Sequence, residues 1–195
     1  MESNPYYSRE ELLAFGFSQV GDPVWISRKS SFYAIRGTLG SHVRIDDFCV
    51  VKGEVSIGSY VHIAGFCSLS GVAGPLVMED CSSLGNRVTL YTGSDDFHAD
   101  SLAGNTVPAD MVTTLKGGVR LGRGALVGAH SVVMPGVEVG DAAAVGAQCV
   151  VTKSVAPGAI LVSGAMRCLP VGRRDVAKIL GLVERLLPGR GQGAA

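Results

Sequence analysis

The sequence predicts an all-β protein whose short strands wind into one continuous triangular coil. Three observations support this fold class: an aliphatic residue recurs every six positions, glycine often follows it, and 47% of the 195 residues are apolar while only 6% are aromatic. An α-helix is excluded as the repeating unit, because its apolar stripe recurs every ~3.6 residues. Glycine at a fixed phase suggests a corner whose turn conformation a residue with a Cβ would resist.

The first predicted element is a short helix at the N-terminus. Ser8 and Glu11 have the spacing of a capping box, and Gly16 provides a stop signal. Residues 1–20 are therefore expected to form a helix and a lead-in that precede the coils.

The coils themselves are expected within residues 21–162. Three hexads, ~18 residues, would close one triangular turn, so the fifteen hexads predict five coils with one apolar column inside. Three of the five cysteines, Cys49, Cys67 and Cys149, fall at inward positions as core filler. The inward aliphatic positions are Leu39, Ile45, Val51, Ile57, Ile63, Leu69, Met78, Leu84, Leu90, Leu121, Val127, Val133, Val139, Val145 and Val151.

Two interruptions break the period. Between Leu69 and Met78 the chain carries a short insertion that contains "VAGP", and between Leu90 and Leu121 it makes a long excursion. The excursion predicts a loop over residues 92–117 that leaves the coil. Long loops on a rigid scaffold are where function concentrates, so the candidate site is expected there.

The last predicted element is a second helix. In "RRDVAKILGLVERLL" the apolar residues recur at helical spacing, which predicts a helix packed across the last coil. Residues 163–195 are expected to form this helix and a disordered tail, and the whole chain is expected to be one domain.

Composition argues against several classes of function. The formal net charge is zero, so no general attraction to nucleic acid or to an anionic membrane is expected. No apolar run approaches the ~20 residues needed to span a bilayer, and the first residues lack a signal pattern, so a cytoplasmic protein is expected. Five cysteines without a C-x-x-C pair favour reduced thiols over a disulfide framework or a zinc ribbon.

From about Val24 to Val155 the repeat resembles that of the hexapeptide acyltransferases. The resemblance implies a left-handed parallel β-helix, although general rules for strand crossovers would favour the right hand. Stretches such as "VRIDDFCVVKG", "SYVHIAGFCSLSG" and "SDDF" followed by "NTVP" are similar to a bacterial surface-polysaccharide branch that includes sugar O-acetyltransferases and nucleotide-amino-sugar N-acyltransferases. The resemblance further implies acetyl-CoA or another acyl-CoA as donor and a sugar or nucleotide-sugar as acceptor. It also implies no metal and a homotrimer with clefts between subunits.

Acyl transfer needs a base that takes a proton from the attacking hydroxyl or amine, and histidine is suited to this near neutral pH. His98 lies in the excursion, where galactoside-type relatives place their catalytic histidine, although their histidine aligns nearer Asp95. His62 is at a phase where amino-sugar N-acetyltransferases carry a cleft histidine. Both stay open as the base, whereas His130 is expected to line a groove or the surface and His42 to lie on the surface. The candidate acceptor-binding acids are Asp95, Asp96 and Asp47, together with Asp46.

The donor is expected along the later coils, where small residues would let a pantetheine arm lie against the backbone. The resemblance matches Gly128 and Ala129 to a pair that contacts pantetheine and Ala147 to a later backbone contact. It matches Thr152 and Lys153 to a pair near the nucleotide phosphates. Lys153, with Arg173 or its neighbours Arg167 and Arg174, could place positive charge on a phosphate.

Two other functions are compatible with this fold. A zinc hydratase of the γ-carbonic-anhydrase type would need three histidines that converge at a subunit boundary, and His42, His62, His98 and His130 contain no close pair. A non-catalytic scaffold would lack acyl-CoA binding. The sequence favours the acyltransferase.

Overall fold

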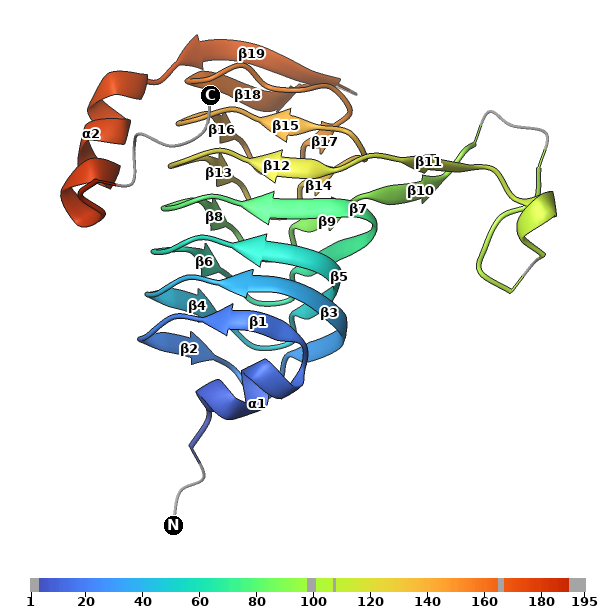
Figure 1. Ribbon diagram of the computed structural model, residues 1–195. Coiled ribbons are helices and arrows are strands. Elements are labelled where there is room, and N and C mark those ends of the chain that lie inside the picture. The colour runs from blue at the N-terminus through green and yellow to red at the C-terminus, as the bar shows by residue number, and fades with distance from the viewer. Residues whose placement is uncertain (1–3, 98–100, 107, 165–166, 190–195) are drawn as a thin grey trace.

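The computed structural model describes residues 4–97, 101–106, 108–164 and 167–189, and of residues 164 and 167–173 it describes the backbone alone. Figure 1 shows a triangular prism that rises from the N-terminal helix, with a long arm at one side and a helix at the other. Its walls are stacks of parallel strands. This confirms the predicted parallel β-helix.

Each face of the prism is a ladder of strands from successive coils. The first face contains β1 (Phe17–Val20), β3 (Ser31–Leu39), β5 (Val50–Ile57), β7 (Ser68–Met78), β12 (Val119–Leu121) and β15 (Glu138–Val139). The second face contains β2 (Val24–Ile26), β4 (Val43–Ile45), β6 (His62–Ile63), β8 (Ser83–Leu84), β13 (Leu126–Val127), β16 (Ala144–Val145) and β18 (Ala159–Gly164). The third face contains the N-terminal parts of β3, β5 and β7, followed by β9 (Thr89–Tyr91), β14 (Val132–Val133) and β17 (Val150–Val151).

Over the described residues the second face has seven parallel strands, so the coil makes about seven turns rather than the five predicted. One extra turn lies at each end. The first was missed because β3 changes register between Tyr33 and Arg36, which breaks the six-residue step before Leu39. The first turn also includes β1, which pairs with β3 on the first face. The coil therefore begins inside residues 1–20, the segment expected to be a lead-in.

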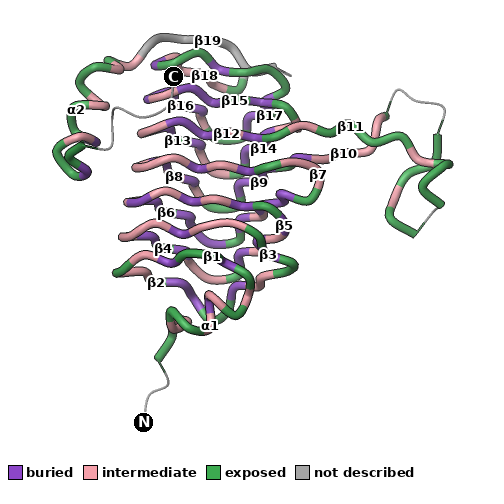
Figure 2. Tube along the Cα trace, in the orientation of Figure 1, coloured by how far each residue is buried: buried purple, intermediate pink, exposed green. Residues whose placement is uncertain are grey.

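The predicted inward positions form the core. All of the aliphatic residues assigned to them are no more than 2% exposed, and Cys49, Cys67 and Cys149 are buried in the same column. Figure 2 shows this buried column along the inside of the coils. Burying each large aliphatic side chain stabilises the fold by ~1.5–3 kcal/mol, so the repeat supplies most of the driving force.

The glycines after the aliphatic positions act differently from the prediction. They do not have a positive φ; instead, a Cβ on most of them would overlap the next coil, as for Gly128, where it would lie 2.5 Å from the backbone nitrogen of Ala147. The left-handed conformation occurs two positions later, at residues such as His42, Tyr60 and His130. These glycines are therefore required by close stacking of coils rather than by their own backbone angles.

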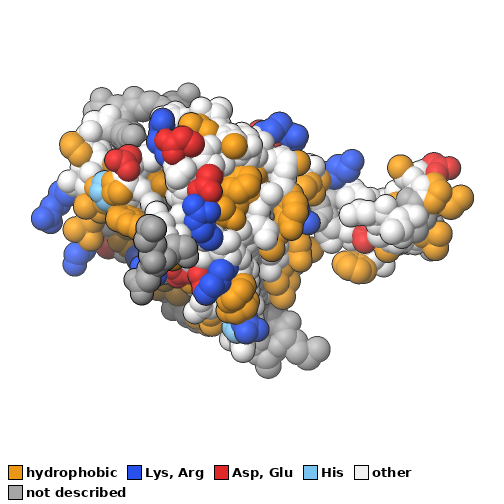
Figure 3. All heavy atoms as spheres, turned by 90° about the horizontal axis from the view of Figure 1, so that it is seen from below, with side chains coloured by type: hydrophobic (Ala, Val, Ile, Leu, Met, Phe, Trp, Pro, Cys, Tyr) orange, Lys and Arg blue, Asp and Glu red, His pale blue; other side chains and the backbone are white. Residues whose placement is uncertain are grey.

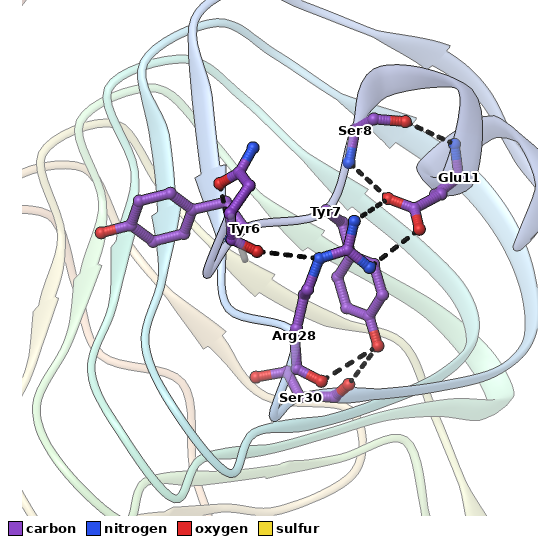
Figure 4. Close-up of polar contacts among 7 residues, drawn as sticks. Tyr6, Tyr7, Ser8, Glu11, Arg28 and Ser30 are labelled. Carbon is purple, nitrogen blue, oxygen red and sulfur yellow. Dashed lines mark hydrogen bonds and ion pairs between the residues drawn. The ribbon is translucent and has the colours of Figure 1, made fainter. Parts of the chain in front are cut away.

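Helix α1 (Arg9–Ala14) begins with the predicted capping box. The backbone nitrogen of Ser8 donates to the Glu11 carboxylate over 2.7 Å, and Glu11 in turn donates its backbone hydrogen to the Ser8 hydroxyl. Arg28 from the first coil pairs with the same carboxylate, and the Tyr7 hydroxyl donates to the backbone oxygens of Arg28 and Ser30 (Figure 4). The helix is thus tied to the lower end of the prism.

The upper end differs from the prediction. Strand β19 (Arg167–Arg173) pairs antiparallel with β18, and helix α2 (Val176–Leu186) runs beside a corner of the coils rather than across the last one. A Cβ on Gly124 would lie 2.8 Å from Cγ2 of Ile179, and one on Gly158 would lie 2.6 Å from Cγ2 of Val176. Within the described part of the chain, no helix combines the length and apolar character needed to cross a membrane.

Candidate functional site

The predicted excursion is an arm that leaves the coil between β9 on the third face and β12 on the first. Its stem is an antiparallel ribbon of β10 (Gly93–Asp95) and β11 (Thr114–Lys116), and a short 3-10 helix, η1 (Ala109–Met111), lies further out. Figure 3, which views the prism from below, shows the arm projecting from one corner of the molecule. That corner is opposite the second face, so the arm and β6 lie on different sides of the chain.

The two interruptions of the repeat meet at the root of this arm. The buried Thr92 hydroxyl donates to the backbone oxygen of Ser70 over 2.8 Å and accepts from the backbone nitrogen of Ala73, in the insertion, over 3.1 Å. Gly117, where the chain returns, donates to the backbone oxygen of Thr92. The insertion therefore anchors the root of the arm to the prism.

Asp95 and Asp96, two predicted acceptor-binding acids, lie half-buried in the stem of the arm. The backbone nitrogen of Asp96 donates to the backbone oxygen of Thr113 over 2.9 Å. His98, one of the two candidate bases, lies outside the described residues. The antiparallel stem therefore fixes the backbone positions of Asp95 and Asp96 relative to the prism.

His62, the other candidate base, lies on the second face in an ionic cluster. Its Nε2 is 2.9 Å from Oδ2 of Asp46, and Nε of Arg44 is 2.7 Å from Oδ1 of the same carboxylate. The parallel register sets Arg44 of β4 directly beside His62 of β6, and His62 beside Ser83 of β8. The three side chains thus come from two consecutive coils.

The carboxylate at the centre of this cluster is held in its charged form. Partial burial by itself would raise the pKa of Asp46, but the hydrogen bonds from Arg44 and His62 outweigh it and keep the pKa below its usual value. Asp46 is therefore an anion at neutral pH.

An open hollow of about 620 Å³ lies over this cluster. Its lining includes aromatic rings from the adjoining corner, where the His42 and Tyr60 rings stack with centroids 4.2 Å apart and Trp25 meets His42 edge to face. His42 was expected to be a plain surface residue, and the structure instead places it in this stack. The hollow is lined by Trp25, His42, Arg44, Asp46, Tyr60, Val61 and His62.

Asp47, which the sequence also suggested for the acceptor side, does not line this hollow. Its carboxylate pairs with Nζ of Lys29 over 2.7 Å and accepts from the Ser27 hydroxyl over 2.5 Å. These partners, Lys29 first, keep the pKa of Asp47 below its usual value. Consecutive aspartates at one corner therefore have different partners, because the chain turns between them.

The predicted donor residues fall at two corners of the upper coils. Gly128 and Ala129 lie directly below Ala147, at the corner between the second and third faces. Thr152 and Lys153 are exposed and follow β17 at the next corner. Arg173 pairs through its backbone with Ala159, and its side chain is not described. The structure brings the three small residues together and places Lys153 across the third face from them.

Three lining residues of the hollow were not singled out from the sequence: Trp25, Arg44 and Tyr60. Trp25 and Arg44 precede the inward residues Ile26 and Ile45 just as His62 precedes Ile63. Aligning the hexads on this outward position would have grouped them with His62.

No group of three or more His, Cys, Asp and Glu side chains with the geometry of a metal site occurs within the part of the chain that the structure describes.

Comparisons with known proteins agree with the fold. A family model described as bacterial transferase hexapeptide (six repeats) matches residues 118–153. A curated dTDP-4-amino-4,6-dideoxy-D-glucose acyltransferase from Escherichia coli is 32% identical over 134 residues, which is 67% of this chain and 69% of that protein.

Two crystal structures of AntD, an N-acyltransferase from Bacillus cereus, are similar over nearly the whole chain. A variant bound to dTDP-4-amino-4,6-dideoxyglucose and coenzyme A is 36% identical with a TM-score of 0.86, covering 95% of this chain and 98% of AntD. The complex with dTDP and 3-hydroxybutyryl-CoA is also 36% identical, with a TM-score of 0.84 and coverage of 95% and 97%. The chain belongs to the hexapeptide-repeat family of acyl-CoA-dependent acyltransferases.

Proposed function

We propose that this enzyme transfers an acyl group from coenzyme A to the 4-amino group of a dTDP-linked 4-amino-4,6-dideoxy sugar. The similarity to AntD carries this proposal, because it extends over 95% of the chain and AntD is bound to that sugar nucleotide and coenzyme A. It favours N-acylation over the O-acylation that the sequence had left open. Acetyl and 3-hydroxybutyryl groups are the donors to compare first.

The hollow on the second face supports a place for the acceptor. Aromatic rings such as those of Tyr60 and Trp25 offer stacking surfaces to a nucleobase, and Arg44 offers positive charge to a diphosphate. His62 would then lie near the amino group. Asp95 and Asp96 would reach the same acceptor from the arm of another subunit.

In the chemical step the amine nitrogen forms a bond to the thioester carbonyl carbon. The C–S bond breaks, its electron pair leaves on sulfur, and the thiolate of coenzyme A takes up a proton. The nitrogen loses a proton to a base, for which His62 and His98 are the two candidates. A backbone N–H near the donor would stabilise the oxyanion.

A homotrimer would complete this site. The arm leaves the corner opposite the second face, so Asp95 of one chain and His62 of the same chain are on different sides of the prism. A cyclic assembly would bring each arm to the second face of a neighbour and give equivalent sites between subunits.

The donor would lie along the upper coils. Gly128, Ala129 and Ala147 present little side chain, so a pantetheine chain could approach the strand backbone there, while Thr152 and Lys153 would face the nucleotide phosphates. Arg173 is a further candidate phosphate contact. Because coenzyme A thioesters and sugar nucleotides are made and used in the cytoplasm, we propose that the reaction takes place there, in the synthesis of a surface polysaccharide.

The test is direct. The purified protein is incubated with dTDP-4-amino-4,6-dideoxyglucose and either acetyl-CoA or 3-hydroxybutyryl-CoA, and the released thiol and the mass of the acylated sugar are measured. The matched control is the dTDP-sugar with a hydroxyl in place of the 4-amino group. Release of thiol with amide formation supports the proposal; absence of both for all donors would favour a non-catalytic scaffold.

Separate His62→Ala and His98→Ala variants then identify the base. The variant that lacks the base should lose at least ~100-fold in kcat, while the other should change far less. Equal, small losses would show that neither histidine takes the proton.

A further inference from the structure

We infer that Asp46 is a positioning residue that holds His62 in the tautomer with its hydrogen on Nε2, and that Arg44 fixes Asp46 for this task. The assignment of the tautomer stands on the geometry and the charges of the cluster. Its meaning for catalysis rests on the proposed function.

The geometry gives each atom of the Asp46 carboxylate a separate partner. Oδ2 lies 2.9 Å from His62 Nε2, and Oδ1 lies 2.7 Å from Arg44 Nε. The Asp46 side chain is 29% exposed, whereas those of Arg44 and His62 are 57% and 48% exposed. The carboxylate is thus the sheltered centre of the cluster, and its two partners are its more exposed ends.

An ionised carboxylate can only accept hydrogen bonds. Because the Arg44 guanidinium can only donate and favours the charged form of Asp46, the contact at 2.9 Å requires a hydrogen on His62 Nε2. In the neutral ring the lone pair is then on Nδ1. Of the two ring nitrogens, Nδ1 is the one that can take a proton from the acceptor.

The other groups around the ring do not compete for this role. Across the strands, His62 has Arg44 on β4 and Ser83 on β8, and the hollow adds Trp25, His42 and Tyr60. The remaining charge nearby, Asp47, is engaged by Lys29 and Ser27. Asp46 is therefore the anion that faces the imidazole among the described groups of this face.

Asp46 also has a second effect. When His62 gains a proton it becomes a cation, and a fixed carboxylate at hydrogen-bonding distance stabilises that cation. Without the carboxylate, the ring is free to adopt either tautomer. Loss of Asp46 should therefore lower kcat.

The tautomer can be tested without any substrate. In protein with ¹⁵N-labelled histidine, the ring nitrogen shifts of His62, assigned with His62→Gln, should show hydrogen on Nε2 at a pH where the ring is neutral. Asp46→Asn should shift the ring towards a mixture of tautomers. A wild-type ring with hydrogen on Nδ1, or shifts unchanged in Asp46→Asn, would overturn the inference even if the enzyme is active.

Kinetics test the catalytic meaning. Asp46→Asn should lower kcat ~10–100-fold, with KM for both substrates within about threefold, and His62→Ala should lose no more when Asp46→Asn is added. Arg44→Met keeps both Asp46 and His62 and should cause a smaller loss of kcat. Because Arg44→Met leaves the Asp46 carboxylate in place, it tests the positioning of His62 even if Asp46→Asn does not fold.

The matched control is Glu138→Gln, which removes an ion-pair partner of Arg120 on the first face and should leave kcat unchanged. Activity of Asp46→Asn within twofold of the wild type, or a change confined to KM, would overturn the positioning role. A wild-type protein without transfer activity would instead count against the proposed function, and the nitrogen shifts would still decide the tautomer.

Discussion

The lower and upper halves of the second face share one backbone register but have different outward side chains. In the lower coils this column contains Trp25, Arg44, His62 and Ser83; in the upper coils it continues with Leu126, Ala144 and Ile160. The inward residues of both halves are aliphatic and buried. The comparison shows that inward positions specify the coil, while outward positions are free to carry chemistry.

The corner beside this face shows the same contrast. Its left-handed position is occupied by His42, Tyr60 and Cys81 below, and by Gly124, Ala142 and Gly158 above. The upper residues are small because α2 lies against that corner, where a Cβ on Gly124 would lie 2.8 Å from Ile179 Cγ2. The small residues at the next corner, Gly128 and Ala147, are not covered by α2 in this way, and we propose that they contact the donor.

The largest expected effect is a loss of folding stability caused by a substitution in the upper half of the prism. Gly128→Ala places a Cβ 2.5 Å from the backbone of Ala147, so it should force adjacent coils apart and destabilise the protein by about 2–3 kcal/mol, measured by urea unfolding. The control is Gly181→Ala, where a Cβ in α2 would meet nothing within 4 Å and should stabilise by about 0.5–1 kcal/mol. Equal stability of Gly128→Ala and wild type would contradict the close-stacking argument.

A smaller effect should appear in the lower half alone. Tyr60→Ala removes one ring of the His42 stack, and with it a stacking surface of the hollow, so KM for the sugar nucleotide should rise about tenfold while KM for the acyl-CoA stays the same. Steady-state kinetics with each substrate varied in turn measure both constants. A rise in the acyl-CoA constant would place the donor, not the acceptor, in the hollow.

The reverse selectivity is expected in the upper half. Lys153 is exposed, so Lys153→Ala should raise KM for acyl-CoA only about threefold to tenfold, and added salt should weaken the difference because it screens an exposed charge. Dephospho-coenzyme A thioesters serve as a second donor in the same assay. Should KM for the sugar nucleotide change instead, the separation of the two halves would be wrong.

The smallest expected effect is on how the free energy of unfolding depends on pH. The folded pKa of Asp46 lies below its usual value of 3.8, so its ion pairs stabilise the protein above that pH and the stabilisation is lost as pH falls through the folded pKa. Asp46→Asn should therefore unfold about 1 kcal/mol or less more easily at neutral pH and match the wild type in strong acid. Denaturation curves at several pH values give the comparison, and a gap that widens in acid would contradict the assigned direction.

Much of the fold could be predicted because the residues that define the repeat all have the same role, which is to fill the buried column. Each of Leu39, Ile63 and Val145 fills one level of the same column, so a constant spacing reports a constant structure. The prediction failed where that spacing changes: at β3, whose register shifts, and at the C-terminus, where β19 rather than α2 pairs with the last coil. There, long-range contacts override the local pattern.

The candidate site could be predicted in part. The sequence suggested His62 and placed Asp46 and Asp47 together on the acceptor side. It did not show that the turn of the chain directs Asp46 to His62 and Asp47 to Lys29. It also treated the "VAGP" insertion and the arm as separate interruptions, although Thr92 joins them. Such pairings depend on contacts between coils about 18 residues apart, which the local pattern does not reveal.

By itself, the sequence determined the all-β coil, its buried column and the place where an arm leaves it. These features follow from the period of inward aliphatic residues and from its interruption, both of which can be counted along the chain. Only the tertiary structure decided the number of coils, the course of α2 and the cluster of Arg44, Asp46 and His62. The reason is physical: burial depends on residue type and phase, whereas a charge cluster depends on which outward side chains the stacked coils bring within hydrogen-bonding distance.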